Sequence, residues 1–248
     1  MTGRLTRISR HPIKGHGRED LASVLLSAGA CLPFDRHWAV AHGAARLVEG
    51  WNPCVNFARG AKAPGLMAIS SMLDEATGQV TLHHPDRGAI TLRPDDPDDL
   101  PRFIAWVTPL NPPDRAQPAR FVRAGRGMTD SAFPSVAILS EASLADLSAR
   151  MGQDLSPHRW RGNLWIDGAE PWAEFGWIGR HIRIGNATLR IEERITRCRA
   201  TTVNPDTGHS DADTLRGLET AFGHQDFGLY ATVIDGGPVT LGDDWTLT

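Results

Sequence analysis

The stretch RITRCRATTVNPDTG, residues 194–208, holds the densest cluster of polar and turn-forming side chains in the chain. The alternating residues before it predict a strand that ends here, and Asn204-Pro205-Asp206-Thr207-Gly208 is typical of a turn. Cys198 lies between Arg197 and Arg199, and cationic neighbours favour the thiolate that metal binding or nucleophilic attack requires. A lone cysteine is more often a small buried hydrophobic residue. The stretch by itself therefore leaves both a chemical and a structural role open for Cys198.

Period-two alternation of apolar residues predicts short β-strands on both sides of this stretch. It recurs through the first ninety residues, with a strand, a turn and a second strand at residues 38–48, and this spacing is typical of a barrel or sandwich. Downstream, residues 182–191 alternate in the same way. The Gly236-Gly237 pair between two apolar runs at residues 233–241 predicts a closing hairpin.

Two helices are predicted by their capping residues and by apolar residues three to four positions apart. Ser140 can cap a helix that runs to Met151, and Gly152 stands where a left-handed C-terminal residue is needed. Asp211 or Asp213 can cap a second helix, which ends at Gly223.

A proline-rich and aspartate-rich segment separates the two halves of the chain. Residues 93–120 contain a dense run of prolines and aspartates interrupted by apolar residues at 103–107. This pattern predicts a linker with one short helix at residues 96–120, between an N-terminal domain at 1–95 and a C-terminal domain at 121–248.

Charge and cysteine content exclude several classes of protein. The net charge of −3 argues against nucleic acid or an anionic membrane as the main partner. Lys14 and Lys62 are the only lysines among the 26 basic residues; the arginines suit phosphate recognition, although a compositional bias of the genome accounts for them equally well. The three cysteines lack the spacing of a disulfide framework or zinc site. With no stretch apolar enough to span a bilayer, we expect a cytoplasmic protein.

The order of residues around Cys198 closely resembles the R-C-x-x-T-T-V-D-P-D-T-G signature of the MOSC family, the molybdenum cofactor sulfurase C-terminal domain group. Other family segments follow in the family's order along nearly the whole chain. They are Pro12-Ile13-Lys14-Gly15, Asp35-Arg36-x-Trp38, Asp130-Ser131-Ala132-x-Pro134, Ser140-Glu141-Ala142-Ser143-Leu144, Arg159-Trp160-Arg161-Gly162-Asn163, Glu174-x-x-Trp177 and Phe227-Gly228-x-Tyr230.

The resemblance implies a mainly β fold, a β-barrel with a few short helices that is α+β in detail, and an N-terminal MOSC-associated β-barrel at residues 1–95. It also implies a molybdenum cofactor, a pyranopterin dithiolene with a phosphate, whose metal is ligated by Cys198. Soft thiolate and forked donors suit such a group. The matching cofactor-binding positions are Lys14, Gly15, Arg36, Ser131, Ala132, Arg161, Asn163, Thr196 and Arg197.

Some positions depart from the family pattern, and the departures lie at the contacts expected near the metal. Gly15 stands where relatives often place Ser, Ala132 replaces a hydroxyl residue, and Phe133 is an extra residue before Pro134. Asp130 is expected to act as a proton donor or to orient the backbone, and capping of its own turn is an equal alternative.

The resemblance points most closely to the branch of the family that reduces amidoximes and N-hydroxylated bases. It implies an oxidoreductase that converts N–OH to N–H. Because the sequence lacks a C-x4-C-x2-C run, the electrons would come from a separate ferredoxin, flavoprotein or haem protein. Two alternatives remain open: a non-catalytic carrier of the cofactor or of sulfur held as a persulfide on Cys198, and a degenerate binding module without metal.

Overall fold

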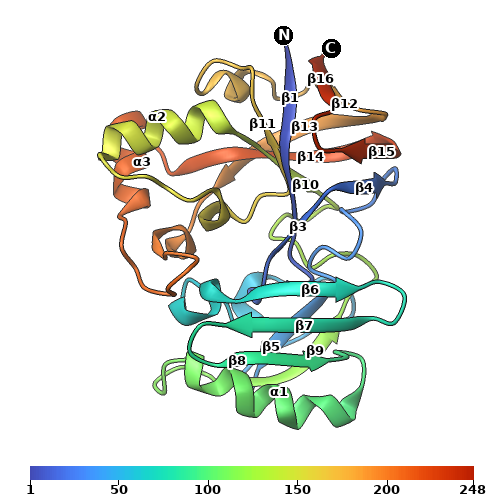
Figure 1. Cartoon of the computed structure of the whole chain (residues 1–248), viewed down its shortest axis with the longest axis vertical. Coiled ribbons are helices and arrows are strands. Elements are labelled where there is room, and N and C mark those ends of the chain that lie inside the picture. The colour runs from blue at the N-terminus through green and yellow to red at the C-terminus, as the bar shows by residue number, and fades with distance from the viewer.

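A closed barrel of seven strands forms the larger part of the molecule (Figure 1), in a computed structural model that describes residues 1–248. In order around the barrel the strands are β11 (Leu164–Ile166), β10 (Val136–Ser140), β14 (Asp226–Asp235), β13 (Ala187–Thr196), β12 (His181–Ile184), β16 (Asp244–Leu247) and β1 (Thr2–Arg10). Pairing of β1 with β11 closes the ring, and the short β3 (Glu19–Leu21) extends from β1. The mainly β fold with a barrel and a few helices is confirmed.

The barrel closes because its long strands place one face of each pleat inside. Leu189 and Ile191 of β13 and Leu229, Ala231 and Val233 of β14 are almost completely buried, while the residues that alternate with them are more exposed. Register shifts along the β13–β14 pair bend the ribbon and so help the sheet to curve into a closed ring.

The two helices predicted from their capping residues are present, and they lie side by side on the outside of the barrel (Figure 1). The helix α2 (Glu141–Met151) begins after Ser140, whose hydroxyl accepts from the backbone N–H of Ser143, and ends at the left-handed Gly152. The helix α3 (Thr214–Phe222) begins after Asp213, the second of the two predicted caps, and ends at Gly223. Both helices pack apolar residues against the outer face of the barrel.

Below the barrel in Figure 1, six further strands form two three-stranded sheets that share a core with a third helix. One sheet contains β2 (Ile13–Lys14), β5 (Trp38–His42) and β9 (Pro118–Arg123), and the other contains β6 (Ser70–Asp74), β7 (Gln79–His84) and β8 (Gly88–Leu92). The helix α1 (Leu100–Val107) lies in the predicted linker. The prediction of a second strand at residues 46–48 is wrong, because these residues form no strand and β5 pairs with β9 and β2.

The sheet pairing differs from the expected organisation of the N-terminal part. Residues 1–95 contribute strands to two three-stranded sheets, and β9 in one of them comes from beyond residue 95. The N-terminal β-barrel domain at residues 1–95 stays a prediction. The first strand, β1, belongs to the large barrel and pairs with β11 and β16. The division of the chain at residues 96–120 stays a prediction, but the sheets do not follow it.

The predicted closing hairpin at residues 233–241 is also wrong. The strand β15 (Gly237–Thr240) pairs with β4 (Ser23–Leu26) and not with β14. A single residue, Gly236, separates β14 from β15, which is too short for a two-residue hairpin turn. Gly236 also packs against the backbone of Leu26, where a side chain would collide with a carbonyl oxygen.

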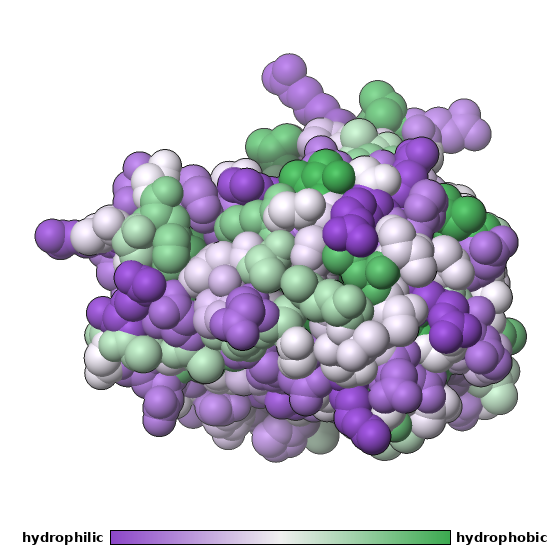
Figure 2. All heavy atoms as spheres, turned by 90° about the horizontal axis from the view of Figure 1, so that it is seen from above, coloured by the Kyte–Doolittle hydropathy of each residue, from purple (hydrophilic) through white to green (hydrophobic).

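Short 3-10 turns connect many of these elements. They are η1 (Cys54–Asn56), η2 (Pro64–Ala68), η3 (Pro97–Asp99), η4 (Thr108–Leu110), η5 (Pro157–Trp160), η6 (Ala173–Gly176) and η7 (Arg199–Thr202). No helix combines the length and the apolar character that a bilayer crossing requires. Figure 2 views the molecule from the barrel end and shows hydrophilic side chains mixed with small groups of apolar ones.

Candidate functional site

A cavity of about 260 Å³ is lined by residues of both the barrel and the N-terminal sheets. Most of the predicted site residues line it: Lys14, Gly15, Arg36, Asp130, Arg161, Thr196, Arg197 and Cys198. These residues lie far apart in the sequence. The fold therefore brings together segments that the sequence connects only through the family resemblance.

Cys198 lies directly after β13, at the first residue before η7. Its backbone is extended, and its carbonyl accepts hydrogen bonds from the backbone N–H and the hydroxyl of Thr201. The side chain is exposed and has no disulfide partner. The backbone is thus tied down while the thiol stays free at the cavity, as a metal ligand requires.

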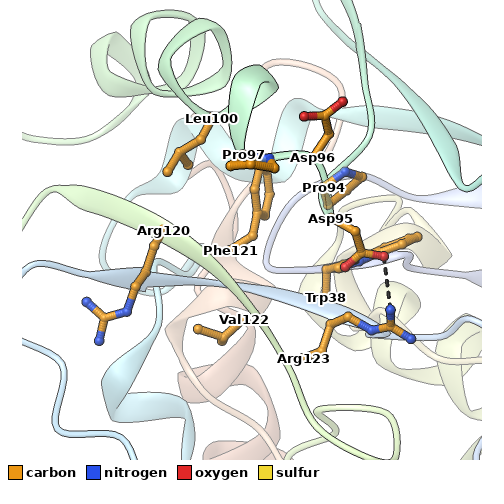
Figure 3. Close-up of a pocket in the computed structure, with 10 residues that line it drawn as sticks. All are labelled: Trp38, Pro94, Asp95, Asp96, Pro97, Leu100, Arg120, Phe121, Val122 and Arg123. Atoms are coloured by element: carbon orange, nitrogen blue, oxygen red, sulfur yellow. Dashed lines mark hydrogen bonds and ion pairs between the residues drawn. The ribbon is translucent and has the colours of Figure 1, made fainter.

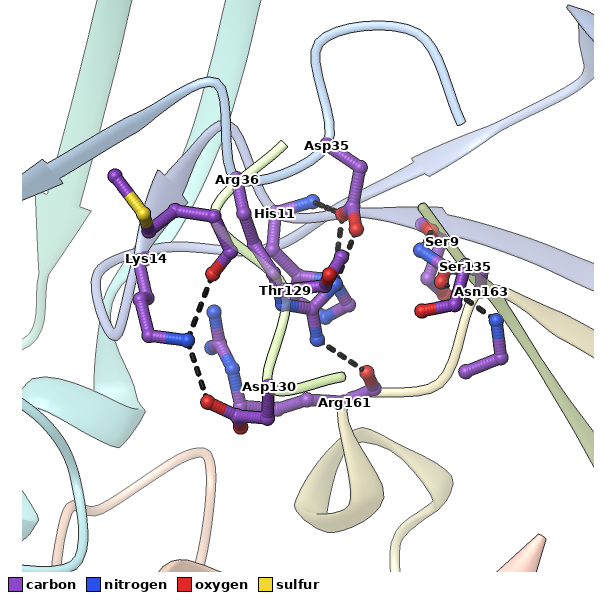
Figure 4. A network of polar contacts seen from close by, with 12 residues as sticks. Ser9, His11, Lys14, Asp35, Arg36, Thr129, Asp130, Ser135, Arg161 and Asn163 are labelled. Carbon is purple, nitrogen blue, oxygen red and sulfur yellow. Dashed lines mark hydrogen bonds and ion pairs between the residues drawn. The ribbon is translucent and has the colours of Figure 1, made fainter. Parts of the chain in front are cut away.

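Lys14 and Asp130 form an ion pair at one side of the cavity (Figure 4). The Nζ atom of Lys14 lies 2.5 Å from Oδ1 of Asp130 and donates to the carbonyl of Met128 at 2.7 Å. Burial lowers the pKa of Lys14, and the carboxylate of Asp130 offsets part of that effect. Burial raises the pKa of Asp130, but Lys14, Arg36 and Arg161 outweigh it and hold this pKa below its usual value. Asp130 is consequently a carboxylate at neutral pH.

Arg36 is held in place by the buried Asp35 and by the backbone. Its guanidinium donates to the Asp35 carboxylate and, at 2.9 Å, to the carbonyl of Arg161 (Figure 4). Asp35 also accepts from the backbone N–H of His11 at 2.8 Å and from its ring. Burial lowers the pKa of Arg36, yet Asp35 and Asp130 hold it above the ordinary value. Arg36 is therefore a fixed positive charge.

Arg161 brings a second guanidinium to the same place without a partner for all of its donors. It follows η5 in a left-handed conformation, with φ of 48°. Its Nη2 atom is buried and has no hydrogen-bond partner. Burial, followed by repulsion from Arg36, lowers the pKa of Arg161 to about 9. A buried, unpartnered cationic donor is costly, and an anionic ligand in the cavity would satisfy it.

In Arg197, in contrast, all three guanidinium nitrogens donate hydrogen bonds within the protein. Its Nε and Nη2 donate to the carbonyl of Phe227, and its Nη1 donates to that of Trp160 at 2.8 Å. Burial lowers the pKa of Arg197 to about 10. Thr196 is similarly engaged, because its hydroxyl donates to Asp226 at 2.6 Å. Both line the cavity, but in this structure they hold its walls together.

Three predicted site residues do not line the cavity. Ser131 is buried, and its hydroxyl donates to the carbonyl of Phe133 at 2.6 Å within its own loop. Ala132 is exposed. Asn163 is buried between two strands: its side chain accepts from the N–H of Ala137 at 3.0 Å and donates to the carbonyl of Ser9 at 3.2 Å. Asn163 thus joins β1 to β10, a structural use that a motif alone does not reveal.

Several cavity residues were not predicted as site residues. Cys54 and Arg59 come from the N-terminal part, and Nη1 of Arg59 contacts the sulfur of Cys54. No pattern in the sequence distinguishes this pair from ordinary loop residues. Tyr230 extends from β14 into the cavity lining, and its place in the Phe227-Gly228-x-Tyr230 motif was the signal that could have identified it.

A second pocket, between α1 and β9, offers fewer groups for binding or catalysis (Figure 3). Its carboxylate Asp95 accepts from the indole N–H of Trp38 at 2.9 Å and pairs with Arg123 at 3.0 Å. The carboxylate of Asp95 is therefore already paired within the protein, and the cavity at Cys198 remains the candidate site.

Comparison with known proteins relates part of the chain to a family. Residues 130–246 match the MOSC domain. The mitochondrial amidoxime-reducing component 1 of Danio rerio is 25% identical over 262 residues, covering 88% of this chain and 74% of that protein. The corresponding protein of Mus musculus is 34% identical over 118 residues, which cover 43% of this chain and 34% of its own length. The second match thus spans about a third of its relative.

Among solved structures, the YuaD protein from Bacillus subtilis aligns over 100% of this chain and 96% of its own, with 12% identity and a TM-score of 0.49. YiiM from Geobacillus stearothermophilus aligns over 46% of this chain and 53% of its own, with 14% identity and a TM-score of 0.37.

Proposed function

Since the chain is a MOSC domain protein, distantly related to the mitochondrial amidoxime-reducing components, we propose that it is a molybdenum-cofactor-binding oxidoreductase that reduces N-hydroxylated substrates. The observation that carries this proposal is a single cavity that presents a free thiol, Cys198, beside the cations Lys14, Arg36 and Arg161.

The donor set fits a molybdenum-pterin group. The exposed sulfur of Cys198 is the soft ligand that such a metal takes. Arg161, with its unpartnered Nη2, offers the forked donor geometry that suits a phosphate or a pterin edge. Arg36 adds a second guanidinium, and Arg59 from the N-terminal part of the chain adds a third. In this proposal Cys198 holds the metal and the arginines hold the anionic parts of the cofactor.

The bound cofactor would supply the two-electron chemistry, and the chain would supply binding, orientation and protons. The apolar side chains of Met67, Trp160 and Ile195 also line the cavity, so part of a bound substrate would be shielded from water. Electrons would come from an external protein such as a ferredoxin, a flavoprotein or a haem protein.

Metal content of purified protein tests the cofactor part of the proposal. Protein from a host supplied with molybdate should contain close to stoichiometric molybdenum, and Cys198→Ala should lose most of it. Cys31→Ala is the matched control, because Cys31 is buried and does not line the cavity. Equal molybdenum in Cys198→Ala and Cys31→Ala would contradict the assignment of the ligand.

Turnover tests the catalytic part. Molybdenum-loaded protein with a reduced viologen dye as electron donor should convert aromatic amidoximes to amidines. Stoichiometric molybdenum without turnover on several amidoximes and N-hydroxylated bases would instead support the non-catalytic carrier. Absence of metal from protein made in a molybdate-fed host would support a binding module without metal.

A further inference from the structure

Three hydroxyl groups line the cavity, and they differ in whether they already make a hydrogen bond within the protein. Thr196 donates to Asp226, and Thr201 donates to the carbonyl of Cys198 at 3.1 Å. Thr201 also contacts the hydroxyl of Thr214 at 2.7 Å. The hydroxyl of Tyr230, the single tyrosine of the chain, makes no hydrogen bond within the protein. It is the cavity hydroxyl that remains free to act on a ligand.

The barrel fixes the position of this ring. Tyr230 lies in β14, where it is opposite Ala137 of β10 and Glu193 of β13. Its ring meets that of Phe133 edge to face, with 6.4 Å between the centroids. Because both neighbouring strands belong to the closed barrel, the side chain has a rigid support, as a reacting group needs.

Burial, together with the nearby carboxylate of Asp130, keeps the proton of Tyr230 on its oxygen. The charged groups that act on it are Asp130 from the loop before β10, Glu193 from β13, Arg197 after β13, and Arg36. Burial, followed by the carboxylate of Asp130, raises the pKa of Tyr230 to about 12, against opposing contributions from Arg197 and Arg36. Asp130, the other acid of the cavity, is already ionised in its pair with Lys14.

We propose that Tyr230 donates the proton that the leaving oxygen requires when the N–O bond of the substrate is cleaved. In this proposal the negative charge of the Asp130 carboxylate keeps that proton on the Tyr230 oxygen until it is transferred. The inference rests on the proposed function. In the overall reaction, R–NH–OH takes up two electrons and two protons and gives R–NH2 and water. Two equivalents of a one-electron carrier, the external electron-transfer protein of the proposed function, supply the electrons. One proton passes from Tyr230 to the oxygen, the second reaches nitrogen from solvent, and solvent reprotonates the phenolate.

Tyr230→Phe in the molybdenum-loaded protein tests this role. The substitution removes the hydroxyl and keeps the ring, so molybdenum content and KM for an aromatic amidoxime should remain as in the wild type. The value of kcat should fall by about 100-fold, a typical contribution of one general acid. Small acidic buffers such as imidazolium should restore part of the rate in Tyr230→Phe in proportion to their concentration, and should not accelerate the wild type.

A second readout needs no activity. Because the chain has one tyrosine, the near-ultraviolet difference absorbance of the phenolate reports on Tyr230 alone. In metal-free protein the phenolate should form well above the ordinary range, and Asp130→Asn should move its formation toward lower pH. Full turnover of Tyr230→Phe, or a lowered rate that no buffer acid rescues, would overturn the donor role. Wild-type protein that holds molybdenum but reduces no amidoxime would remove the reductase function itself.

Discussion

At the scale of single residues, the cavity contains guanidinium groups of two kinds. Arg197 donates to the carbonyls of Phe227 and Trp160 and so closes the wall of the cavity. Arg161 keeps a buried Nη2 without a partner and lies close enough to Arg36 for repulsion to lower its pKa. An arrangement that is costly in the free protein is expected where a ligand later supplies the missing acceptor.

Opposite stability effects should follow from replacing these two arginines by methionine. In metal-free protein, Arg161→Met should leave the free energy of unfolding unchanged or raise it by about 1 kcal/mol, because an uncompensated buried charge is removed. Arg197→Met should lower it by roughly 1–3 kcal/mol, since two buried carbonyls lose their donor. Urea unfolding measures both. Molybdenum content should fall in Arg161→Met, and a clear loss of stability in that variant would argue that Arg161 is part of the scaffold.

At the scale of elements, the turn after β2 brings two segments of backbone into close contact. Gly15 has φ of +76°, and a Cβ atom there would lie 2.6 Å from the carbonyl oxygen of Ala58. The same φ region occurs at Gly29, with φ of +69°, where a Cβ atom would meet open space. The glycine at position 15 is therefore required by packing as well as by conformation.

Alanine at these two glycines separates conformational strain from collision. Gly29→Ala should lower the free energy of unfolding by about 1 kcal/mol, the cost of left-handed backbone in an L-residue. Gly15→Ala should lower it by roughly 2–4 kcal/mol, because the segment at Ala58 must also move. Thermal or urea unfolding of both variants gives the comparison. Equal losses would mean that the backbone at Ala58 yields without cost.

The elements that the sequence predicts well are those set by neighbouring residues. The ends of α2 and α3 follow from Ser140, Gly152, Asp213 and Gly223, since capping acts within one turn. The pairing of β15 with β4 is not predictable in this way, because it depends on residues about two hundred positions apart.

The candidate site shows the same limit. Family motifs identify Cys198, Lys14 and Arg161, all of which line the cavity. They do not reveal that the side-chain amide of Asn163 is hydrogen-bonded to β1 and β10. Nor do they reveal that a segment without a motif contributes Cys54 to the cavity. Whether a side chain faces the cavity or the protein interior is decided by tertiary packing, and a sequence motif does not contain that information.

At the scale of the whole molecule, the N-terminal half contains buried groups that make folding sensitive to acid. His16 is completely buried, its Nδ1 donates to the carbonyl of Lys14 at 2.9 Å, and its Nε2 has no partner. Burial lowers the pKa of His16 to about 4. Burial also holds the pKa of His11 well below its ordinary value. Both imidazoles are therefore neutral in the folded protein near neutral pH and are stabilised in that form by the fold.

Acid should consequently destabilise the protein well before its carboxylates are titrated. A histidine whose pKa is lower in the folded than in the unfolded state contributes its full stabilisation above about pH 6.5, and loses it as the pH falls toward about 4. For His16 the loss over this window is about 3 kcal/mol. Urea unfolding at a series of pH values should show that the free energy of unfolding declines as the pH falls.

The variant His16→Gln, whose amide can still donate to the Lys14 carbonyl, tests the role of this histidine. Its free energy of unfolding should decline less steeply, by the contribution of one proton taken up on unfolding. His181→Gln is the control, because His181 is only partly buried and lies in the barrel strand β12. The ring of His16 lies against that of Phe103, with 5.8 Å between the centroids. An unchanged slope in His16→Gln would mean that His16 takes up its proton as readily in the folded as in the unfolded state, and that the packing at Phe103 tolerates the charge.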